Sequence, residues 1–314
     1  MADRDLGERL LTLASMALAP LTAAVAKRLG NSREARRIWE ARGVLPLRAH
    51  YYSPVILADT VPSEAWEEVD PLAGVDWNED GQLALLERLA PHAPGAGELQ
   101  ADLGPDVPRF TLDNPNFGAG DAETLFAMLR LFAPQRVVEV GSGWSTLVTV
   151  AARRAHGLAE HVCIEPFEMP WLERLPGVTV ERSPVESLPP DYFARLAAGD
   201  VLLIDSSHVL RQGGDVVWLY LRVLPSLAPG VLVHVHDIFV PRPYPREWVE
   251  MWRFWNEAQL LQAFLAFNAE FEVLLALNDL AHRHRKELAV VAPSVLDGAA
   301  EPGSFWFMRR KAGA

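Results

Sequence analysis

The chain has 314 residues, of which 50% are hydrophobic and 22% are charged. This composition excludes a wholly disordered chain and supplies enough apolar residues for a large core. The net charge of −12 argues against a protein that wraps a nucleic-acid backbone, because such proteins present a basic surface. The single cysteine, Cys163, excludes an intramolecular disulfide and fits a reducing cytoplasm.

The N-terminal region, residues 1–110, shows no alternation of strands and helices. Apolar spacing predicts helical segments at 8–29, 32–42 and 80–90. The apolar stretch at 10–26 is short for a membrane span, and acidic residues precede it, where a signal peptide has positive charge. Because Pro20 interrupts this stretch, we expect two short helices and no membrane span. The sequence therefore predicts a mainly helical extension that covers the substrate or forms a subunit contact.

From residue 111 to residue 314 the pattern changes to alternating strands and helices. Apolar, β-rich runs lie at 136–140, 161–165, 178–181, 200–205, 230–237, 271–277 and 304–310. Helical runs lie at 122–132, 145–155, 191–197, 214–227 and 256–267. Strands of this kind between helices indicate a mostly parallel sheet that is covered on both faces. The predicted fold class is α/β, with a doubly wound, Rossmann-like sheet of seven strands.

A glycine loop, EVGSGWST at 139–146, follows the first of these strands. In doubly wound folds the ligand binds at the carboxyl ends of the strands, where glycines let the backbone approach it closely. Thr146 stands where a dinucleotide-binding loop has Gly or Ala, and the absence of a following lysine excludes a P-loop. The loop therefore favours a nucleotide-like ligand other than NAD(P) or ATP.

Two acidic residues, Glu139 and Glu165, are candidates for contacts with this ligand. Glu139 precedes the first glycine and can receive the ammonium group of S-adenosylmethionine (SAM). Glu165 ends the second strand, where a carboxylate can accept two hydrogen bonds from ribose hydroxyls. An NAD enzyme places an acid similarly, so Glu165 supports an adenosine ligand without choosing between the two.

Four segments resemble class I SAM-dependent methyltransferases when they are taken together and in order: EVGSGWST, CIEP, DVLLIDSSH and LAPGVLVHVHDIF. They are most similar to a bacterial group found with sugar and natural-product biosynthesis genes. The resemblance covers about residues 110–310, and seven strands with two late ones match the methyltransferase variant of the fold. It implies a SAM site made of Glu139, Gly141, Ser142, Gly143, Glu165 and Asp205, with Ser183 or Glu186 near the adenine.

Two aspartates and two histidines follow the fourth and fifth strands, and we expect Asp205, His208, His236 and Asp237 to converge there. In one alternative Asp205, His236 and Asp237 bind a divalent cation, as the equivalent residues of catechol-type O-methyltransferases do. His236 then suits a transition metal better than magnesium. In the other, slightly preferred alternative there is no metal, and His208 is the general base that Asp205 or Asp237 orients.

Aromatic and basic residues in two other segments are candidates for binding the methyl acceptor: Arg48, Tyr51 and Tyr52 in one, Tyr244 and Arg246 in the other. The leading hypothesis is a cytoplasmic O-methyltransferase, with a homodimer as the candidate oligomer, that acts on a small molecule or glycoside in bacterial secondary or polysaccharide metabolism. We expect no nucleic-acid partner. The alternatives are a SAM-binding module without catalysis and, against the evidence of Thr146, an NAD(P)-dependent oxidoreductase.

Overall fold

The computed structural model of the chain describes residues 2–29, 32–47, 49–154, 160–167, 169–298 and 300–310. The chain divides into two compact units. The first consists of Met1–Pro62 with Arg246–Phe254, and the second of Ser63–Pro245 with Trp255–Ala314. The segment from residue 63 to residue 110 therefore belongs to the same unit as the sheet.

The described residues of the first unit form three α-helices, α1 (Ala2–Leu29), α2 (Arg33–Glu40) and α7 (Arg246–Glu250), and a 3₁₀ turn at Ala58–Thr60. The expectation of two short helices before residue 27 is wrong, because α1 continues through Pro20. Proline removes a single backbone hydrogen bond from a helix, and the flanking leucines and alanines are strong helix formers. The Ser32 hydroxyl caps α2 by accepting a hydrogen bond from the backbone amide of Ala35 at 3.2 Å.

One stretch of α1, Arg9–Arg28, is long and apolar enough to cross a membrane by length and composition, and none of it is buried. Signal sequences near an N-terminus meet the same criterion. A single helix of this kind is a weak indication, and it assigns no membrane location to the chain.

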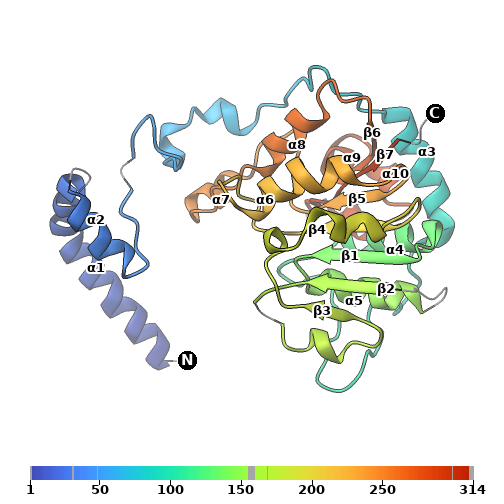
Figure 1. Cartoon of the computed structure of the whole chain (residues 1–314), viewed down its shortest axis with the longest axis horizontal. Helices are drawn as coiled ribbons and strands as arrows, with labels where there is room; N and C mark the ends of the chain where they lie inside the picture. The colour runs from blue at the N-terminus through green and yellow to red at the C-terminus, as the bar shows by residue number, and fades with distance from the viewer. Residues whose placement is uncertain are drawn as a thin grey trace. The chain divides into compact units, whose positions relative to one another are not determined.

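The second unit is built on a seven-stranded sheet in the order β3-β2-β1-β4-β5-β7-β6 (Figure 1). Its strands are β1 (Arg136–Val140), β2 (Glu160–Ile164), β3 (Thr179–Glu181), β4 (Val201–Ile204), β5 (Leu232–Val235), β6 (Phe271–Ala276) and β7 (Phe305–Arg309). Strand β7 runs antiparallel to both of its neighbours, and the other pairs are parallel. The predicted fold class is confirmed, and the predicted strands lie within three residues of the observed bounds.

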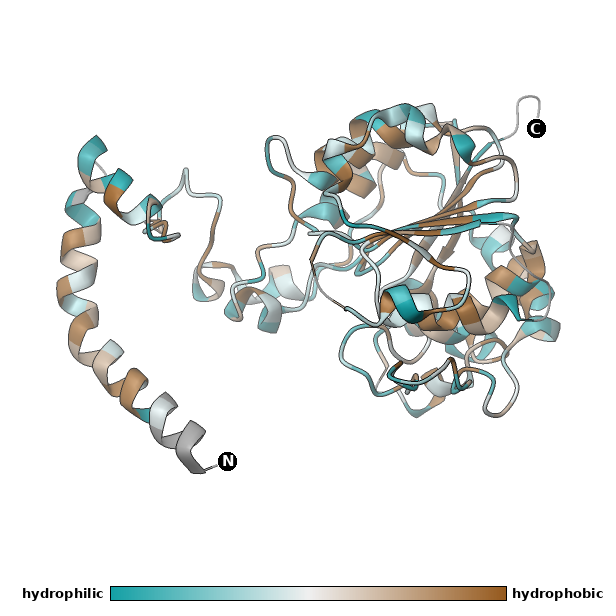
Figure 2. Cartoon of the chain, turned by 60° about the horizontal axis from the view of Figure 1, so that its bottom comes forward, coloured by the Kyte–Doolittle hydropathy of each residue, from teal (hydrophilic) through white to brown (hydrophobic). Residues whose placement is uncertain are grey.

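Helices cover both faces of this sheet, which Figure 2 shows nearly edge-on. They are α3 (Glu79–Leu89), α4 (Asp121–Phe132), α5 (Trp144–Arg153), α6 (Asp215–Trp218), α8 (Glu257–Leu265), α9 (Leu277–Arg283) and α10 (Arg285–Leu288). The helix predicted at 191–197 is instead a 3₁₀ segment, Pro190–Arg195, in which prolines at 189 and 190 leave too few amides for a stable α-helix. The helix predicted at 214–227 changes from α6 to a π-turn at Leu219–Val223 and a 3₁₀ turn at Leu224–Ser226.

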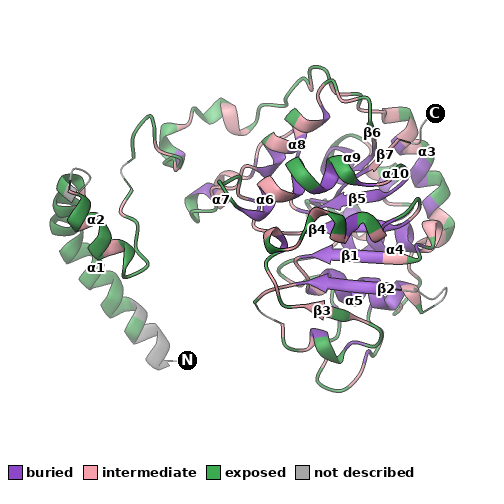
Figure 3. Ribbon diagram, in the orientation of Figure 1, coloured by how far each residue is buried: buried purple, intermediate pink, exposed green. Residues whose placement is uncertain are grey.

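The central strands form the buried middle of the unit (Figure 3). All four residues of β4 and all four of β5 are buried, which explains why these strands lack in–out alternation in the sequence. Val140 of β1 pairs with Ile204 of β4, so the two strands end side by side. The loops that follow them, at 141 and 205, are therefore brought together at the carboxyl edge of the sheet.

Candidate functional site

The glycine loop turns sharply between β1 and α5. Gly141 has a φ of +76°, and a Cβ atom added there would lie 1.7 Å from the backbone carbonyl oxygen of Asp205. Only glycine fits this close approach of two backbones. The loop is closed at its far end by Thr146, whose hydroxyl accepts a hydrogen bond from the amide of Gly143 at 3.0 Å. The threonine that departs from the dinucleotide pattern thus has a structural role in this loop.

A cavity of about 300 Å³ lies beside the loop, at the carboxyl ends of β1, β2 and β4. This volume is within the range of small-molecule binding sites. The predicted site residues Gly141, Glu165, Glu186 and Asp205 all line it. Phe167, which the sequence analysis did not single out, also lines it and is 83% exposed. An exposed aromatic ring at the edge of a cavity offers a flat apolar face to a base.

Glu165 is oriented by the backbone on either side of the cavity. One carboxylate oxygen accepts a hydrogen bond from the amide of Phe167 at 3.0 Å, and the other accepts one from the amide of Ser142 at 3.2 Å. Its carboxylate is thereby fixed at the end of β2, where ribose hydroxyls were expected. Ser183 is not part of the lining, since its hydroxyl donates to a Glu181 carboxylate oxygen at 2.6 Å.

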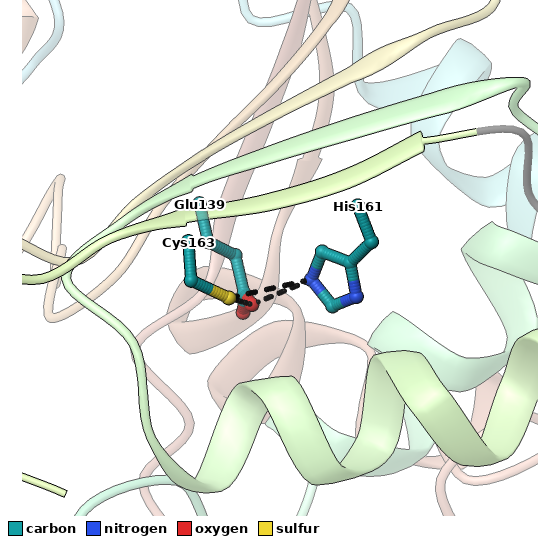
Figure 4. A group of neighbouring side chains, drawn as sticks. All are labelled: Glu139, His161 and Cys163. Carbon is teal, nitrogen blue, oxygen red and sulfur yellow. Dashed lines mark hydrogen bonds and ion pairs between the residues drawn. The ribbon is translucent and has the colours of Figure 1, made fainter. Parts of the chain in front are cut away.

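Glu139 lies in a buried cluster with His161 and Cys163, and it is not among the lining residues of the cavity. Figure 4 shows the three side chains converging from two neighbouring strands. One carboxylate oxygen of Glu139 lies 2.9 Å from Nε2 of His161, and it accepts a hydrogen bond from Sγ of Cys163 at 3.3 Å. Burial, together with the negative charge of Glu139, raises the pKa of the Cys163 thiol well above its usual value. Cys163 is therefore a protonated packing residue and not a reactive thiolate.

The second group of predicted residues converges where β4 and β5 end. Nε2 of His208 lies 3.3 Å from Oδ1 of Asp205 and 3.7 Å from Oδ2 of Asp237. His208 and Asp237 both have left-handed backbones, with φ of +58° and +55°. This conformation is unfavourable for residues with a Cβ atom, although aspartate and histidine adopt it more often than most.

A third carboxylate, Glu257 at the start of α8, completes this cluster and was missed in the sequence. Its Oε2 atom lies 2.9 Å from Nδ1 of His208, and its side chain is fully buried. Burial opposes the positive charge of His208, but hydrogen bonds to Asp205 and Glu257 outweigh it and raise the pKa from 6.5 to about 10. His208 is thus an imidazolium at neutral pH.

His236 does not join this cluster in the way that the metal alternative required. Its Nε2 lies 3.0 Å from the backbone carbonyl oxygen of Asn116 and 3.6 Å from Oδ1 of Asp237. Within the described residues, the three ligand atoms that come close enough to share an ion here belong to Asp205, His208 and Asp237. His234, on the same face of β5, pairs with the Ser304 hydroxyl at 2.9 Å, and burial lowers its pKa well below 6.5.

The predicted acceptor-binding residues are divided between the two units. Tyr244 belongs to the second unit, where it is buried and its hydroxyl accepts a hydrogen bond from the amide of Ala258 at 3.2 Å. In the first unit, Tyr51 and Tyr52 are exposed with ring centroids 5.2 Å apart. Arg246, also in the first unit, pairs with Asp59 at 2.6 Å and Glu250 at 2.7 Å. Arg48 lies outside the described residues.

Residues 138–238 match the sequence profile of a family described as a methyltransferase domain. This segment contains the glycine loop, Glu165 and the strand ends with Asp205, His208 and Asp237. This match covers less than half of the chain. The cavity beside Gly141 offers a carboxylate, that of Glu165, and a close approach of the backbone to a ligand. No curated protein matches the sequence.

Several solved structures resemble this chain in part. The plantazolicin methyltransferase BpumL, in complex with SAH (S-adenosylhomocysteine), is 12% identical with a TM-score of 0.41, over 60% of this chain and 82% of its own. The O-methyltransferase TomG from Streptomyces achromogenes is involved in tomaymycin synthesis, and its structure is in complex with SAM. It is 16% identical with a TM-score of 0.39, and the match covers 75% of this chain and 97% of TomG. An O-methyltransferase from Bacillus cereus in complex with SAH is 12% identical with a TM-score of 0.36, and the match covers 81% of this chain and 100% of the other. At such values, nothing about the acceptor follows from these structures.

Proposed function

We propose that the protein is a SAM-dependent methyltransferase, which transfers the methyl group of SAM to a hydroxyl group of a small molecule or glycoside. The observation that carries the proposal is the cluster of His208 with Asp205 and Asp237, because Asp205 also lines the cavity. In this reaction the sulfur–methyl bond breaks, an oxygen–methyl bond forms, and the hydroxyl releases its proton. An imidazole between carboxylates provides groups that can hold and move that proton.

The charges of the cluster fit this task. Two carboxylates face Nε2 of His208, a third, that of Glu257, faces Nδ1, and the imidazolium carries one positive charge. The remaining negative charge on the Nε2 side can accept a hydrogen bond from the acceptor hydroxyl and receive the proton that it releases. We assign Asp205 and Asp237 as the carboxylates that orient the hydroxyl and receive its proton, and His208 as the imidazolium that shares this proton through Nε2.

The same donor set fits a divalent cation. Two carboxylate oxygens and an imidazole nitrogen lie within 4.8 Å of one another, which suits manganese or zinc as well as magnesium. When bound there, a cation would lower the pKa of the acceptor hydroxyl. We propose Asp205, His208 and Asp237 as its ligands in place of the set with His236, whose Nε2 faces the Asn116 carbonyl oxygen.

Methyl transfer from radiolabelled SAM to a panel of phenols and glycosides tests the proposal. We expect an O-methylated product, SAH as the second product, and loss of turnover in His208→Gln with SAH binding retained in calorimetry. An N-methylated or C-methylated product would overturn the hydroxyl assignment, and full turnover in His208→Gln would overturn the site. Loss of turnover with a chelator and recovery with manganese would support the cation, whereas unchanged turnover would support His208 alone.

A SAM-binding module without catalysis is the competing function. The convergence of His208 with Asp205 and Asp237 speaks against it, because a module that only binds SAM has no need of an imidazole between two carboxylates at this position. The resemblance to the bacterial sugar and natural-product group supports secondary or polysaccharide metabolism as the setting. The buried free thiol of Cys163 supports a cytoplasmic location.

A further inference from the structure

We infer that Glu257 is a positioning residue for His208: it accepts the Nδ1 proton and thereby fixes the imidazole with Nε2 facing Asp205 and Asp237. The inference rests on the proposed role of His208. The two residues are 49 positions apart and come from different elements, the loop after β4 and the first residue of α8. Their contact is therefore made by the fold and not by local sequence.

The environment of Glu257 indicates that its carboxylate is kept for this contact. Glu257 is 0% exposed, and one of its oxygens lies against His208, whereas the buried hydroxyl of Tyr220 is another polar group that interacts with its carboxylate. Burying an ionised carboxylate is costly unless a positive group compensates it. Burial raises the pKa of Glu257, and the imidazole of His208 opposes this effect. A fold that needed only packing here would be more stable with an apolar residue.

The start of α8 also holds His208 from two further sides. The indole ring of Trp255 lies 4.3 Å from the imidazole ring, centroid to centroid. The backbone amide of Asn256 donates to the carbonyl oxygen of His208 at 3.0 Å, and the Asn256 side chain accepts from the amide of Leu210 at 2.6 Å. Three consecutive residues therefore fix the ring plane, the backbone and the protonated nitrogen of one histidine.

These contacts with the start of α8 also account for the left-handed backbone of His208. Such a conformation costs roughly 1–3 kcal/mol and persists where the surroundings determine it. The hydrogen bonds of His208 with the Asn256 amide and with Glu257 hold it in this conformation. Without Glu257 the contact with Trp255 would still restrict the ring plane, but the imidazole could flip about its Cβ–Cγ bond, and either nitrogen could then face Asp205 and Asp237.

The experiment compares wild type, Glu257→Gln and the matched control Asp279→Asn, each saturated with SAH. Asp279 is also a buried acid of this unit, but it pairs with Trp77 at 3.0 Å and Arg283 at 3.1 Å, away from His208. The first readout is the Nδ1–H signal of the His208 imidazole in nitrogen-15 NMR, assigned by its loss in His208→Gln. The second is kcat and KM with the best phenol or glycoside of the panel.

In wild type we expect a downfield, slowly exchanging Nδ1–H proton, as a strong hydrogen bond to a carboxylate produces. In Glu257→Gln we expect this proton to shift upfield and kcat to fall about 10–100-fold with little change in KM. Asp279→Asn should leave both unchanged. A wild-type Nδ1–H signal in Glu257→Gln, or no such signal in wild type, would overturn the inference.

The outcome for His208→Gln separates this inference from the proposed function. Full turnover in His208→Gln means that the proposed site is wrong, whatever Glu257 does. Loss of turnover in His208→Gln with wild-type kcat in Glu257→Gln means that the positioning role alone is wrong. Should Glu257→Gln fail to fold, Glu257→Asp replaces it, because the shorter side chain keeps the charge and withdraws it from Nδ1.

Discussion

Nδ1 of His208 lies 2.9 Å from Oε2 of Glu257, and both side chains are almost completely buried. Nε2 of the same imidazole faces Asp205 and Asp237 on the cavity side. The histidine thus connects a carboxylate in the core to Asp237 and to Asp205, which lines the cavity. In this arrangement the protonation of His208 affects the free energy of unfolding as well as catalysis.

The first prediction concerns this protonation. The pKa of His208 is raised from 6.5 to about 10 in the folded chain, so the folded state binds the proton more tightly. The resulting stabilisation is fully present below pH 6.5 and is lost as pH rises through 10. We expect the unfolding free energy of wild type, relative to His208→Gln, to decrease from pH 7 to pH 10 in urea titrations. Parallel pH profiles for the two proteins would contradict the raised pKa.

The second prediction concerns Glu165. Its carboxylate is fixed by the amides of Ser142 and Phe167 and lines the cavity. Hydrogen bonds to a charged group contribute about 1.5–3 kcal/mol, so Glu165→Gln should weaken SAH binding about 10–100-fold in calorimetry. Glu160, at the other end of β2, pairs with Arg195 at 2.6 Å and provides the matched control. Equal affinities for Glu165→Gln and Glu160→Gln would show that Glu165 does not hold the ribose.

The third prediction compares two glycines of one loop. Gly141→Ala would place a Cβ atom 1.7 Å from the Asp205 carbonyl oxygen, in a left-handed backbone. We expect a lower Tm and loss of SAH binding. At Gly143, whose φ of 172° is extended, a Cβ atom would lie 3.6 Å from Cε of Met169, an ordinary contact. Gly143→Ala should therefore keep the wild-type Tm, and a Tm loss in Gly143→Ala as large as in Gly141→Ala would contradict this account.

Much of the cavity could be predicted from the sequence, because parallel strands end at one edge of a sheet. The positions of Asp205, His208 and Asp237 follow from apolar runs that end just before them. Gly141 and Glu165 follow from the same rule, and the structure places both in the lining. Predicting these residues required only the local sequence pattern and the order of the strands and helices.

The rest depends on contacts between distant segments, which a single sequence does not show. Glu257 begins an ordinary amphipathic helix, and nothing in its neighbours indicates that it faces His208. Glu139 pairs with Cys163 across the β1–β2 ladder, so its side chain joins the cluster with His161, a direction that only the strand register fixes. A local rule can also fail. A proline inside an apolar stretch predicts a break in the helix, but α1 continues through Pro20.

The last prediction decides which residues hold a cation, if His208 does not act alone. Manganese binding to the SAH complex can be followed by calorimetry and by electron paramagnetic resonance. Because Asp237 contributes a ligand oxygen to the cluster, Asp237→Asn should weaken manganese binding at least tenfold. His236→Gln removes a buried imidazole next to Asp237 whose Nε2 faces the Asn116 carbonyl oxygen, so manganese affinity should stay within about twofold of wild type. Loss of manganese binding in both His236→Gln and Asp237→Asn would instead restore the set of Asp205, His236 and Asp237 that the sequence first indicated.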